Sequence, residues 1–305
     1  MILSPAGDIV QLVTMQTEKP KLGFIGAGRV GTGLASAFVR AGIGVVAVAS
    51  RSAASAQVLA KRLPGARACA PQEVADRADI VFLTVPDDAI EAVASGIKWR
   101  SASACVHCSG AAELDVLKKA AADGAFAGGF HPLHMFGEAG ESPGALAGSA
   151  IALAGPDALV DELERLARFL DARPLRLPEG GRALYHAAAN FSGAFVIALV
   201  QETIALWGKL GIAEADALAA LLPLLRGTAD NVEKLGTAGG LGSAIARGDI
   251  GTLRKHLDVL AKEAPDSLEL YRILSLRTIP LALAKGTLDP EAAEEITTLL
   301  RSRGT

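Results

Sequence analysis

A glycine-rich turn near the start of the chain constrains its fold most strongly. Its six residues read Gly26-Ala27-Gly28-Arg29-Val30-Gly31. A short apolar run at residues 21–25 precedes the turn, and apolar residues recur at helical spacing from Val30 to Ala41. A strand that passes through glycines directly into a helix is typical of the first unit of a parallel α/β sheet.

The alternation of strand and helix continues to about residue 177. The run at residues 80–85 is continuously apolar, as expected of a strand buried on both faces of a parallel sheet. Further strands are predicted at residues 45–49, 66–70, 103–108, 125–130, 150–154 and 174–177, and helices at residues 53–62 and 157–171. The pattern therefore predicts an α/β fold, a doubly wound and mostly parallel sheet.

The glycine turn also predicts a ligand. Gly26 would allow the tight turn, Gly28 would let the backbone approach a pyrophosphate, and Gly31 would let the helix pack against the sheet. Arg29 and Val30 begin the helix, whose free N–H groups attract phosphate. The sequence thus predicts a dinucleotide site, and the alternative is a purely structural turn.

The end of the second strand favours NADP as the cofactor. An NAD site would place a carboxylate there for the ribose 2′-hydroxyl, but this chain has Ser50-Arg51-Ser52. The Arg51 guanidinium can pair with a 2′-phosphate, and the two hydroxyls can donate to it. The alternative is a solvated surface arginine.

Strand signals end at the segment 178–181, which is rich in proline and glycine. We expect a tail at residues 1–19, an NADP-binding domain at residues 20–178 and an all-α domain at residues 179–305. Helix breaks are expected in the last domain at Gly211, Gly227, Gly239-Gly240, Gly248, Pro265, Pro280 and Gly286. The apolar run 187–206 contains polar residues, which favours a buried core helix over a membrane span.

Composition excludes several classes of partner. The net charge of −3 argues against a nucleic-acid partner, because the chain is not basic enough to bind along a phosphate backbone. Three cysteines in 305 residues do not form a disulfide framework, which fits a reducing cytoplasm. The first 20 residues do not resemble a signal peptide, and we expect no membrane partner.

Polar residues follow the later strands, at the edge of the sheet where ligands bind. Val85-Pro86-Asp87 follows the fourth strand, where the nicotinamide half would run, although Asp87 could instead cap the next helix. Ser109 follows the fifth strand and His131 lies at the end of the sixth. Imidazole titrates near neutral pH, so His107 and His131 at these strand ends are candidates for proton transfer.

A metal site or a redox dithiol is the rival interpretation of this region. Cys105, His107 and Cys108, with His131 and His134, include the ligand types of zinc. On a strand, however, Cys105 and Cys108 point to opposite faces, and a redox Cys-x-x-C normally opens a helix. The sequence therefore predicts structural cysteines and no metal site.

The first helix after the segment 178–181 carries Tyr185, His186 and Asn190. His186 and Asn190 are four residues apart and share a helix face. They either face the substrate cleft or form a polar stripe at a domain interface.

Together these motifs resemble a family of uncharacterised proteins that pair a Rossmann-like domain with a helical domain of unknown function, DUF2520. The resemblance covers nearly all of residues 21–286, and its most specific parts are His131-Pro132-Leu133 and the segment from Tyr185 to Ala189. Further matching pieces are the glycine turn, Val85-Pro86-Asp87-Asp88, Cys108-Ser109-Gly110, Ala246-Arg247-Gly248-Asp249 and His256-Leu257.

More distantly, the chain is similar to the superfamily of 6-phosphogluconate dehydrogenase and pyrroline-5-carboxylate reductase. Several of those enzymes carry Lys-x-x-x-Asn on the first helix of the second domain, where this chain has His186 and Asn190. The resemblance implies a homodimer built through the helical domains.

The sequence predicts an NADP-dependent oxidoreductase that transfers a hydride between the nicotinamide and a small carbonyl, imine or hydroxy-acid substrate. His131 or His186 would be the acid/base, and Asn190 and Ser109 would orient the substrate. The alternative is a non-catalytic NADP(H)-binding sensor or scaffold.

Overall fold

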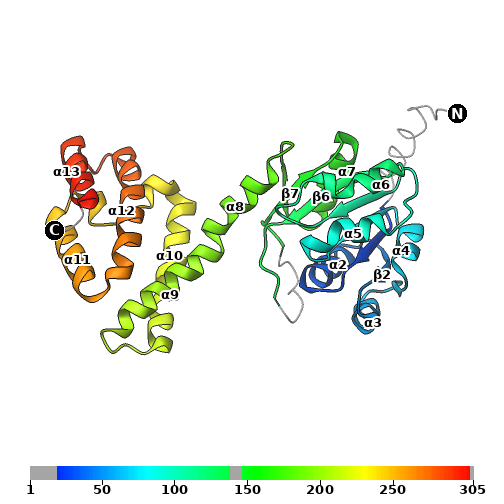
Figure 1. Ribbon diagram of the computed structural model, residues 1–305, viewed down its shortest axis with the longest axis horizontal. Helices are drawn as coiled ribbons and strands as arrows, with labels where there is room; N and C mark the ends of the chain where they lie inside the picture. Colours follow the sequence, from blue (N-terminus) through cyan, green and yellow to red (C-terminus); the bar gives the residue numbers. More distant parts are fainter. Residues whose placement is uncertain (1–18, 138–145, 303–305) are drawn as a thin grey trace. The chain divides into compact units, whose positions relative to one another are not determined.

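A computed structural model describes residues 19–137 and 146–302 of the chain (Figure 1). Contacts within the chain divide it into two compact units, one that extends through Phe191 and one that begins at Ser192. The first helix after the segment 178–181 is thereby counted with the sheet. Each unit is described by itself.

The first unit contains one eight-stranded sheet. In sheet order, the strands are β3 (Arg67–Ala68), β2 (Val45–Ala49), β1 (Leu22–Ile25), β4 (Ile80–Leu83), β5 (Ala104–His107), β6 (Phe126–Pro132), β7 (Ala150–Ala154) and β8 (Arg173–Arg176). All neighbours are parallel except β6 and β7. Strand order reverses between β1 and β4, and in open α/β sheets ligands bind beyond the carboxyl ends of the strands at such a switch point.

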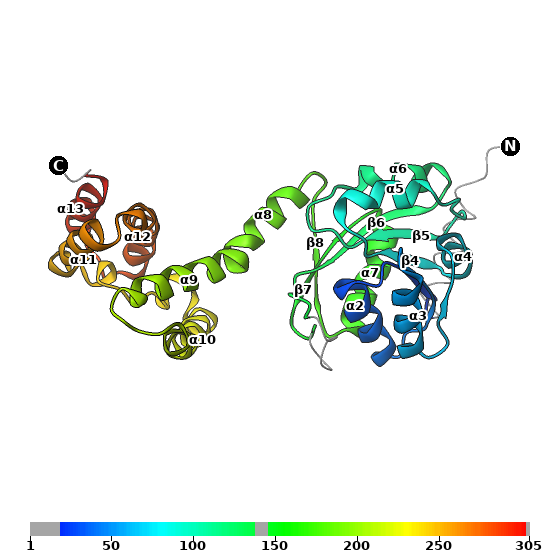
Figure 2. The same ribbon diagram turned by 60° about the horizontal axis from the view of Figure 1, so that its bottom comes forward.

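Helices cover both faces of this sheet, which confirms the doubly wound fold (Figures 1 and 2). Helices α2 (Arg29–Arg40), α3 (Ala53–Arg62) and α7 (Asp157–Phe169) contribute to one core cluster, and α4 (Pro71–Arg77), α5 (Ile90–Ser95) and α6 (Lys118–Ala122) contribute to the other. Phe24, Phe38, Phe82 and Phe130 pack together in the first cluster, with ring centroids 5.2–6.5 Å apart. Burial of these rings is a large part of what holds α2 against the sheet.

Most predicted elements of the first unit are confirmed to within a few residues. Strands β2 and β7 and helix α3 have the predicted bounds, and Gly42 ends α2 with a φ of 74°. The third strand is shorter than predicted, because only Arg67 and Ala68 pair with β2. The sixth is longer and includes His131, which pairs with Ala152 of β7.

The helical part of the chain comprises α8 (Arg182–Ser192), α9 (Ala194–Gly208), α10 (Glu214–Gly239), α11 (Ile250–Glu263), α12 (Pro265–Lys285) and α13 (Pro290–Arg301). Leu253, Leu257, Ile279, Ala282 and Ile296 are among the buried residues that join α11, α12 and α13 in one core cluster. The prediction that strands end at about residue 177 is confirmed for the described residues.

Two of the predicted helix breaks are wrong. Gly227 lies inside α10 and Pro280 inside α12, because packing between helices can outweigh local propensity. Pro265 and Gly286 do bound α12, and Gly286 adopts a left-handed conformation with a φ of 76°. Gly248 is left-handed too, and Asp249 accepts a hydrogen bond from the Thr252 amide at the start of α11.

The prediction that residues 187–206 form a buried core helix is also wrong. No residue of α9 is buried in the described chain, and Phe195 and Ile197 are 47% and 58% exposed. By length and composition alone, the stretch Arg182–Gly208 could cross a membrane, and none of its apolar window is buried. The apolar character of this stretch is as predicted, but the rest of the described chain does not bury its side chains.

Candidate functional site

The glycine turn is held close to the end of β4. Gly26 has a φ of 117°, and a Cβ there would lie 2.4 Å from the carbonyl oxygen of Thr84. The Thr84 hydroxyl donates to the Gly26 carbonyl at 2.8 Å. A Cβ at Gly31 would lie 2.2 Å from that same Gly26 oxygen. Both glycines therefore allow a backbone approach that no side chain permits.

Gly28 differs from these two glycines because its surroundings are open. It is exposed, and a Cβ there would meet nothing within 4 Å. Gly28 is the N-cap of α2, and no side chain caps the helix. The N–H groups of the first turn are therefore available to an anion, and the turn can admit a pyrophosphate.

Arg51 lies beside this turn at the end of β2. The Gly26 amide donates to the Ala49 carbonyl at 2.8 Å, which joins the ends of β1 and β2. Arg51 is exposed and has no ion-pair partner in the part of the chain that the structure describes. The Ser52 hydroxyl accepts from the Ser55 amide at 3.3 Å and caps α3, while Ser50 is half-buried. This end of β2 thus offers one unpaired guanidinium and no carboxylate at residues 50–52.

Ser109 links the ends of β4 and β5. Its hydroxyl donates to Asp87 Oδ2 at 2.6 Å and accepts from the amides of Ala111 and Ala112 at 3.2 and 2.9 Å. The alternative in which Asp87 caps the next helix is wrong, since α5 begins at Ile90 without a side-chain cap. The Asp87 carboxylate instead accepts the hydrogen bond of Ser109 and so stabilises the turn after β5. Val85 and Pro86 connect the end of β4 to Asp87.

His131, Tyr185 and His186 form a compact cluster at the carboxyl end of β6. His131 Nδ1 lies 3.1 Å from the Tyr185 hydroxyl, and its ring meets those of Tyr185 and His186 edge to face at 5.7 Å. A Cβ at Gly110 would lie 2.3 Å from His186 Cδ2 and 2.9 Å from His131 Nε2. Gly110, after β5, therefore provides the space in which the two imidazoles meet.

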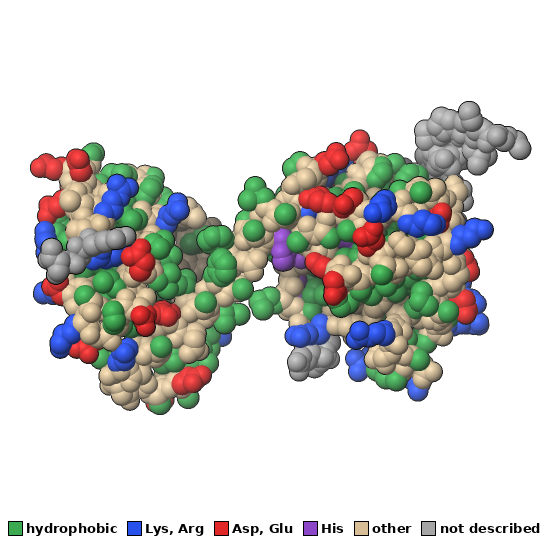
Figure 3. Space-filling view, in the orientation of Figure 1, with side chains coloured by type: hydrophobic (Ala, Val, Ile, Leu, Met, Phe, Trp, Pro, Cys, Tyr) green, Lys and Arg blue, Asp and Glu red, His purple; other side chains and the backbone are tan. Residues whose placement is uncertain are grey.

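His131 is a neutral imidazole at pH 7. Burial lowers its pKa to about 4, with further lowering by His186 and Arg182 and an opposing effect of Asp87. Histidine side chains reach the surface of the first unit (Figure 3). His131, Tyr185 and His186 are each partly exposed, so the cluster is in contact with solvent.

Arg182 is a functional candidate that sequence reasoning missed. It is fully buried, its Nη2 donates to the Ser109 carbonyl, and its backbone amide donates to Glu113 Oε1 at 3.0 Å. A Cβ at Gly129 would lie 2.6 Å from Arg182 Nη1, so this glycine makes room for the guanidinium. Nε and Nη1 have no hydrogen-bond partner among the described residues. The signal in the sequence was the pair Gly128-Gly129 inside a strand, which indicates the close approach of another group.

The remaining histidines of this region do not join the cluster in the same way. His107 is fully buried, and burial, with the nearby Arg182, lowers its pKa to about 3, so that it is neutral. His134 packs against Phe136 with ring centroids 5.1 Å apart. Asn190 Nδ2 donates to the His186 carbonyl at 3.1 Å, which commits its amide to its own helix.

The cysteines are arranged as predicted for structural residues. Cys105 and Cys108 are both buried in separate core clusters on opposite faces of the sheet. Burial raises the pKa of both thiols, that of Cys108 to about 12. Within the described residues, no group of three or more His, Cys, Asp or Glu side chains could hold a metal ion.

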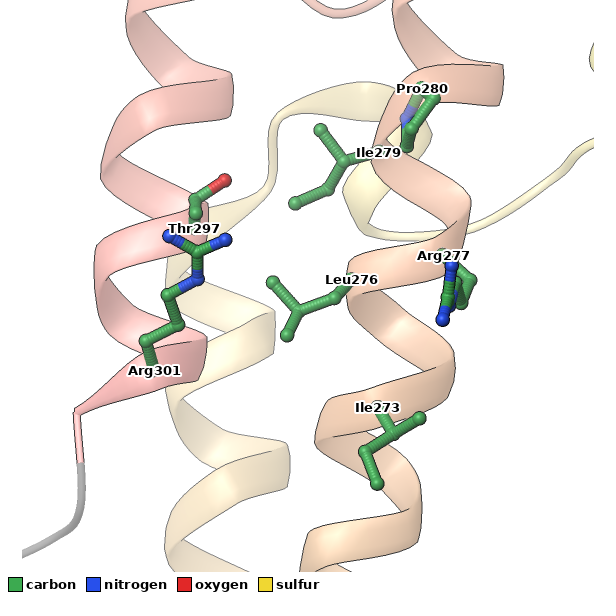
Figure 4. Close-up of a pocket in the computed structure, with 7 residues that line it drawn as sticks. All are labelled: Ile273, Leu276, Arg277, Ile279, Pro280, Thr297 and Arg301. Atoms are coloured by element: carbon green, nitrogen blue, oxygen red, sulfur yellow. The ribbon is translucent and has the colours of Figure 1, made fainter.

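Cavities among the described residues lie away from the histidine cluster and the glycine turn. One, of about 850 Å³, lies beside the start of β6 and the end of β7, and its lining includes Glu113, Asp115 and Glu179, whose charge is unsuited to phosphates. Another, of about 490 Å³, lies between α12 and α13, where Arg277 and Arg301 flank apolar side chains (Figure 4). Neither contains the histidine cluster or the glycine turn.

Comparison with known proteins agrees with the fold of the sheet unit. Residues 8–132 match a Rossmann-like domain, and residues 149–278 match a domain of unknown function, DUF2520. No curated protein sequence matches the chain.

Several solved structures are similar over most of the chain. A candidate NADP oxidoreductase from Bacteroides fragilis is 25% identical, with a TM-score of 0.66 over 84% of this chain and 96% of its own. Protein TM1727 from Thermotoga maritima is 24% identical, with a TM-score of 0.72 over 87% and 99%. A 1-pyrroline-5-carboxylate reductase from Streptococcus pyogenes is 17% identical, with a TM-score of 0.58 over 92% and 98%. The last two show a shared fold.

The two domain matches follow one another in the order that the motifs predicted, and together they span most of the described chain. The chain thus contains a Rossmann-like domain and a DUF2520 domain, the two domains of the family that its motifs resemble.

Proposed function

We propose that this protein is an NADP-dependent oxidoreductase, which transfers a hydride between the nicotinamide and a small carbonyl, imine or hydroxy-acid substrate. The observation that carries the proposal is the open Gly28 at the start of α2, which no side chain caps. Arg51, on the adjacent strand end, has no ion-pair partner among the described residues. The similar Bacteroides fragilis structure, described as a candidate NADP oxidoreductase, supports it.

The residues of the first unit would hold NADP along the carboxyl edge of the sheet. The pyrophosphate would lie on the turn from Gly26 to Gly31, against the first residues of α2, Arg29 and Val30. The 2′-phosphate would lie at Ser50, Arg51 and Ser52, and the nicotinamide half along Val85, Pro86 and Asp87. When bound, the reduced nicotinamide supplies a hydride.

Proton transfer would fall to the histidine cluster. His131 and His186 lie together at the end of β6. The Ser109 hydroxyl, by contrast, donates its hydrogen bond to Asp87, and the Asn190 amide donates to the His186 carbonyl of its own helix. Ser109 and Asn190 would orient the substrate, Asn190 through its side-chain oxygen Oδ1 and Ser109 through the turn that its hydroxyl stabilises. Tight NADPH binding without turnover of any substrate would instead favour a sensor.

Replacing Arg51 by glutamate is expected to weaken NADPH binding about 100-fold and NADH binding less than about 3-fold. The change removes a charge-assisted pair with the 2′-phosphate and adds a like charge, but NADH lacks that phosphate. Calorimetric titration with each nucleotide gives the two ratios. Arg62→Glu, at the far end of α3, makes the same charge change and should alter neither affinity. Equal losses for both nucleotides in the Arg51 variant would remove the case for NADP.

We also propose that the protein is a homodimer formed through its helical domain. Helix α9 exposes a long apolar surface, and α10 adds the exposed side chains of Leu218, Leu222 and Leu224. Many exposed apolar side chains on two helices that pack together are typical of an interface rather than of a solvated surface. A second copy of the chain would bury the apolar side chains of α9 and α10, so that no membrane is needed to cover them.

Ile197→Asp is expected to convert a dimer into a monomer, because it places a charge on the exposed face of α9. Light scattering coupled to size exclusion, without detergent, should give twice 31.2 kDa for the wild type and 31.2 kDa for the variant. Val58→Asp, at a residue of similar exposure on α3, should leave the mass unchanged. A monomeric wild type, or one that needs detergent to stay in solution, would contradict the proposal.

A further inference from the structure

The contacts of Tyr185 are not explained by cofactor binding. Tyr185 is one of two tyrosines in the chain. It lies on α8, half-buried, with its hydroxyl 3.1 Å from His131 Nδ1. The pair lies next to the Ser109–Asp87 turn, where the substrate end of the proposed cofactor would be. A phenol in this place can give a proton to a substrate, provided that its proton is not already bonded to His131.

We propose that Tyr185 is the proton donor of the reaction and that His131 resupplies its proton, so that the substrate is a carbonyl compound. This inference rests on the proposed oxidoreductase function and specifies its substrate class. Tyr185 is thereby assigned as a catalytic residue and His131 as its proton relay.

The direction of the Tyr185–His131 hydrogen bond decides whether the pair can work in this way. A phenol has one proton, and a neutral imidazole carries its proton on one of two nitrogens. If His131 carries the proton on Nδ1, this N–H donates to the Tyr185 oxygen and leaves the phenol proton free for a substrate. The relay therefore requires the Nδ1–H tautomer. In that tautomer Nε2, the ring nitrogen on the side of Gly110, carries no proton and can accept one.

Charges around the pair support this division of roles. Burial raises the pKa of the Tyr185 phenol, so it keeps its proton at neutral pH, while the Arg182 guanidinium lowers it. Arg182 would therefore stabilise the phenolate that forms when the proton leaves. His131 is surrounded by His186, Arg182 and Asp87, and it stays neutral at pH 7 with a pKa of about 4. Neutral His131 can therefore give its Nδ1 proton to the phenolate without first becoming an imidazolium.

The step balances as a two-electron reduction. The hydride that the cofactor supplies forms a C–H bond at the carbonyl carbon, and the π pair moves to the oxygen. This oxygen takes the proton of the Tyr185 hydroxyl, the phenolate takes the Nδ1 proton of His131, and Nε2 takes a proton from solvent. The products are an alcohol and the oxidised cofactor.

An iminium substrate would make little use of this donor. Its nitrogen already carries the proton, so hydride addition gives a neutral amine directly. A developing alkoxide, by contrast, is much more basic than a phenolate and gains from a proton donor in the transition state. The Tyr185 relay thus favours ketones, aldehydes or 2-oxo acids.

Nuclear magnetic resonance of the full chain, labelled with ¹⁵N-histidine and free of cofactor, tests the relay. Signals of His131 are identified by their loss in His131→Gln. We expect the Nδ1–H tautomer for His131 at pH 7.5 and a change to Nε2–H in Tyr185→Phe. Tyr271→Phe is the matched control, since Tyr271 makes the same type of contact with His256 Nδ1 at 2.8 Å. That control should leave the His131 signals unchanged.

The Nε2–H tautomer in the wild type, or no change in Tyr185→Phe, would overturn the relay whether or not NADPH binds. A turnover measurement on the same proteins tests the substrate class. NADPH oxidation should occur with a panel of small ketones and 2-oxo acids, and Tyr185→Phe should lower kcat about 100-fold with an unchanged Kd for NADPH. Oxidation with cyclic imines alone, or with no probe, would overturn the carbonyl assignment. Absence of NADPH binding would instead refute the proposed function.

Discussion

Gly28→Ala is expected to weaken NADPH binding about 100-fold, a loss of about 2.7 kcal/mol, without a change in thermal stability. The alanine Cβ meets nothing within 4 Å, and Gly28 has an extended backbone that alanine adopts without strain. The methyl group would nevertheless occupy the space above the first N–H groups of α2, where a pyrophosphate must approach. Binding is thus expected to change while folding does not.

Calorimetric titration with NADPH and a thermal melt of the same sample measure the two effects. Gly44→Ala is the matched control, because Gly44 is also exposed and a Cβ there also meets nothing within 4 Å. Gly44 lies at the amino end of β2, whereas the glycine turn lies at the carboxyl ends of the strands. Its replacement should therefore leave the affinity for NADPH unchanged. If Gly28→Ala binds NADPH as the wild type does, the turn does not hold a pyrophosphate.

Gly31→Ala is expected to show the opposite pattern, a loss of stability of about 3 kcal/mol. The new Cβ would lie 2.2 Å from the Gly26 carbonyl oxygen and 2.5 Å from the Thr84 hydroxyl. The first of these is a backbone atom, so relief requires α2 to move away from the sheet. Apolar contacts of Leu34 and Phe38 would be lost with it.

Urea unfolding, followed by tryptophan fluorescence, measures this loss in the first unit. The chain has two tryptophans, and Trp99 is buried in the second core cluster of the sheet. In a Trp207→Phe background, the signal therefore reports on the sheet unit. The midpoint should fall for Gly31→Ala and stay constant for Gly28→Ala. Equal midpoints for the two variants would show that the helix does not need this close contact.

Apolar runs that alternate with segments of helical spacing were enough to predict the sheet and the helices α2, α3 and α7. Continuous apolar runs identify buried strands, and glycines with a positive φ, such as Gly26 and Gly42, mark the turns. The direction of a strand has no such signature. The pairing of β6 with β7 is antiparallel, although residues 125–130 and 150–154 have the same apolar character as parallel strands.

The candidate site was predicted only in part, since its contacts join distant residues. The histidines at the strand ends were identified from the sequence, but His131 and Tyr185 are 54 residues apart and their contact depends on where α8 packs. The pair Gly128-Gly129 indicates the close approach of another group, but the sequence does not identify that group as Arg182, because buried arginines are rare. The apolar pattern of α9 likewise cannot tell burial within one chain from burial against another.

The central claim is that the glycine turn and Arg51 together form a binding site for a pyridine dinucleotide with a 2′-phosphate. Calorimetric titration of the wild-type protein with NADPH and with NADH tests it most directly. We expect one site per chain and an affinity for NADPH about 100-fold greater than that for NADH. Binding of neither nucleotide, or tighter binding of NADH, would contradict it.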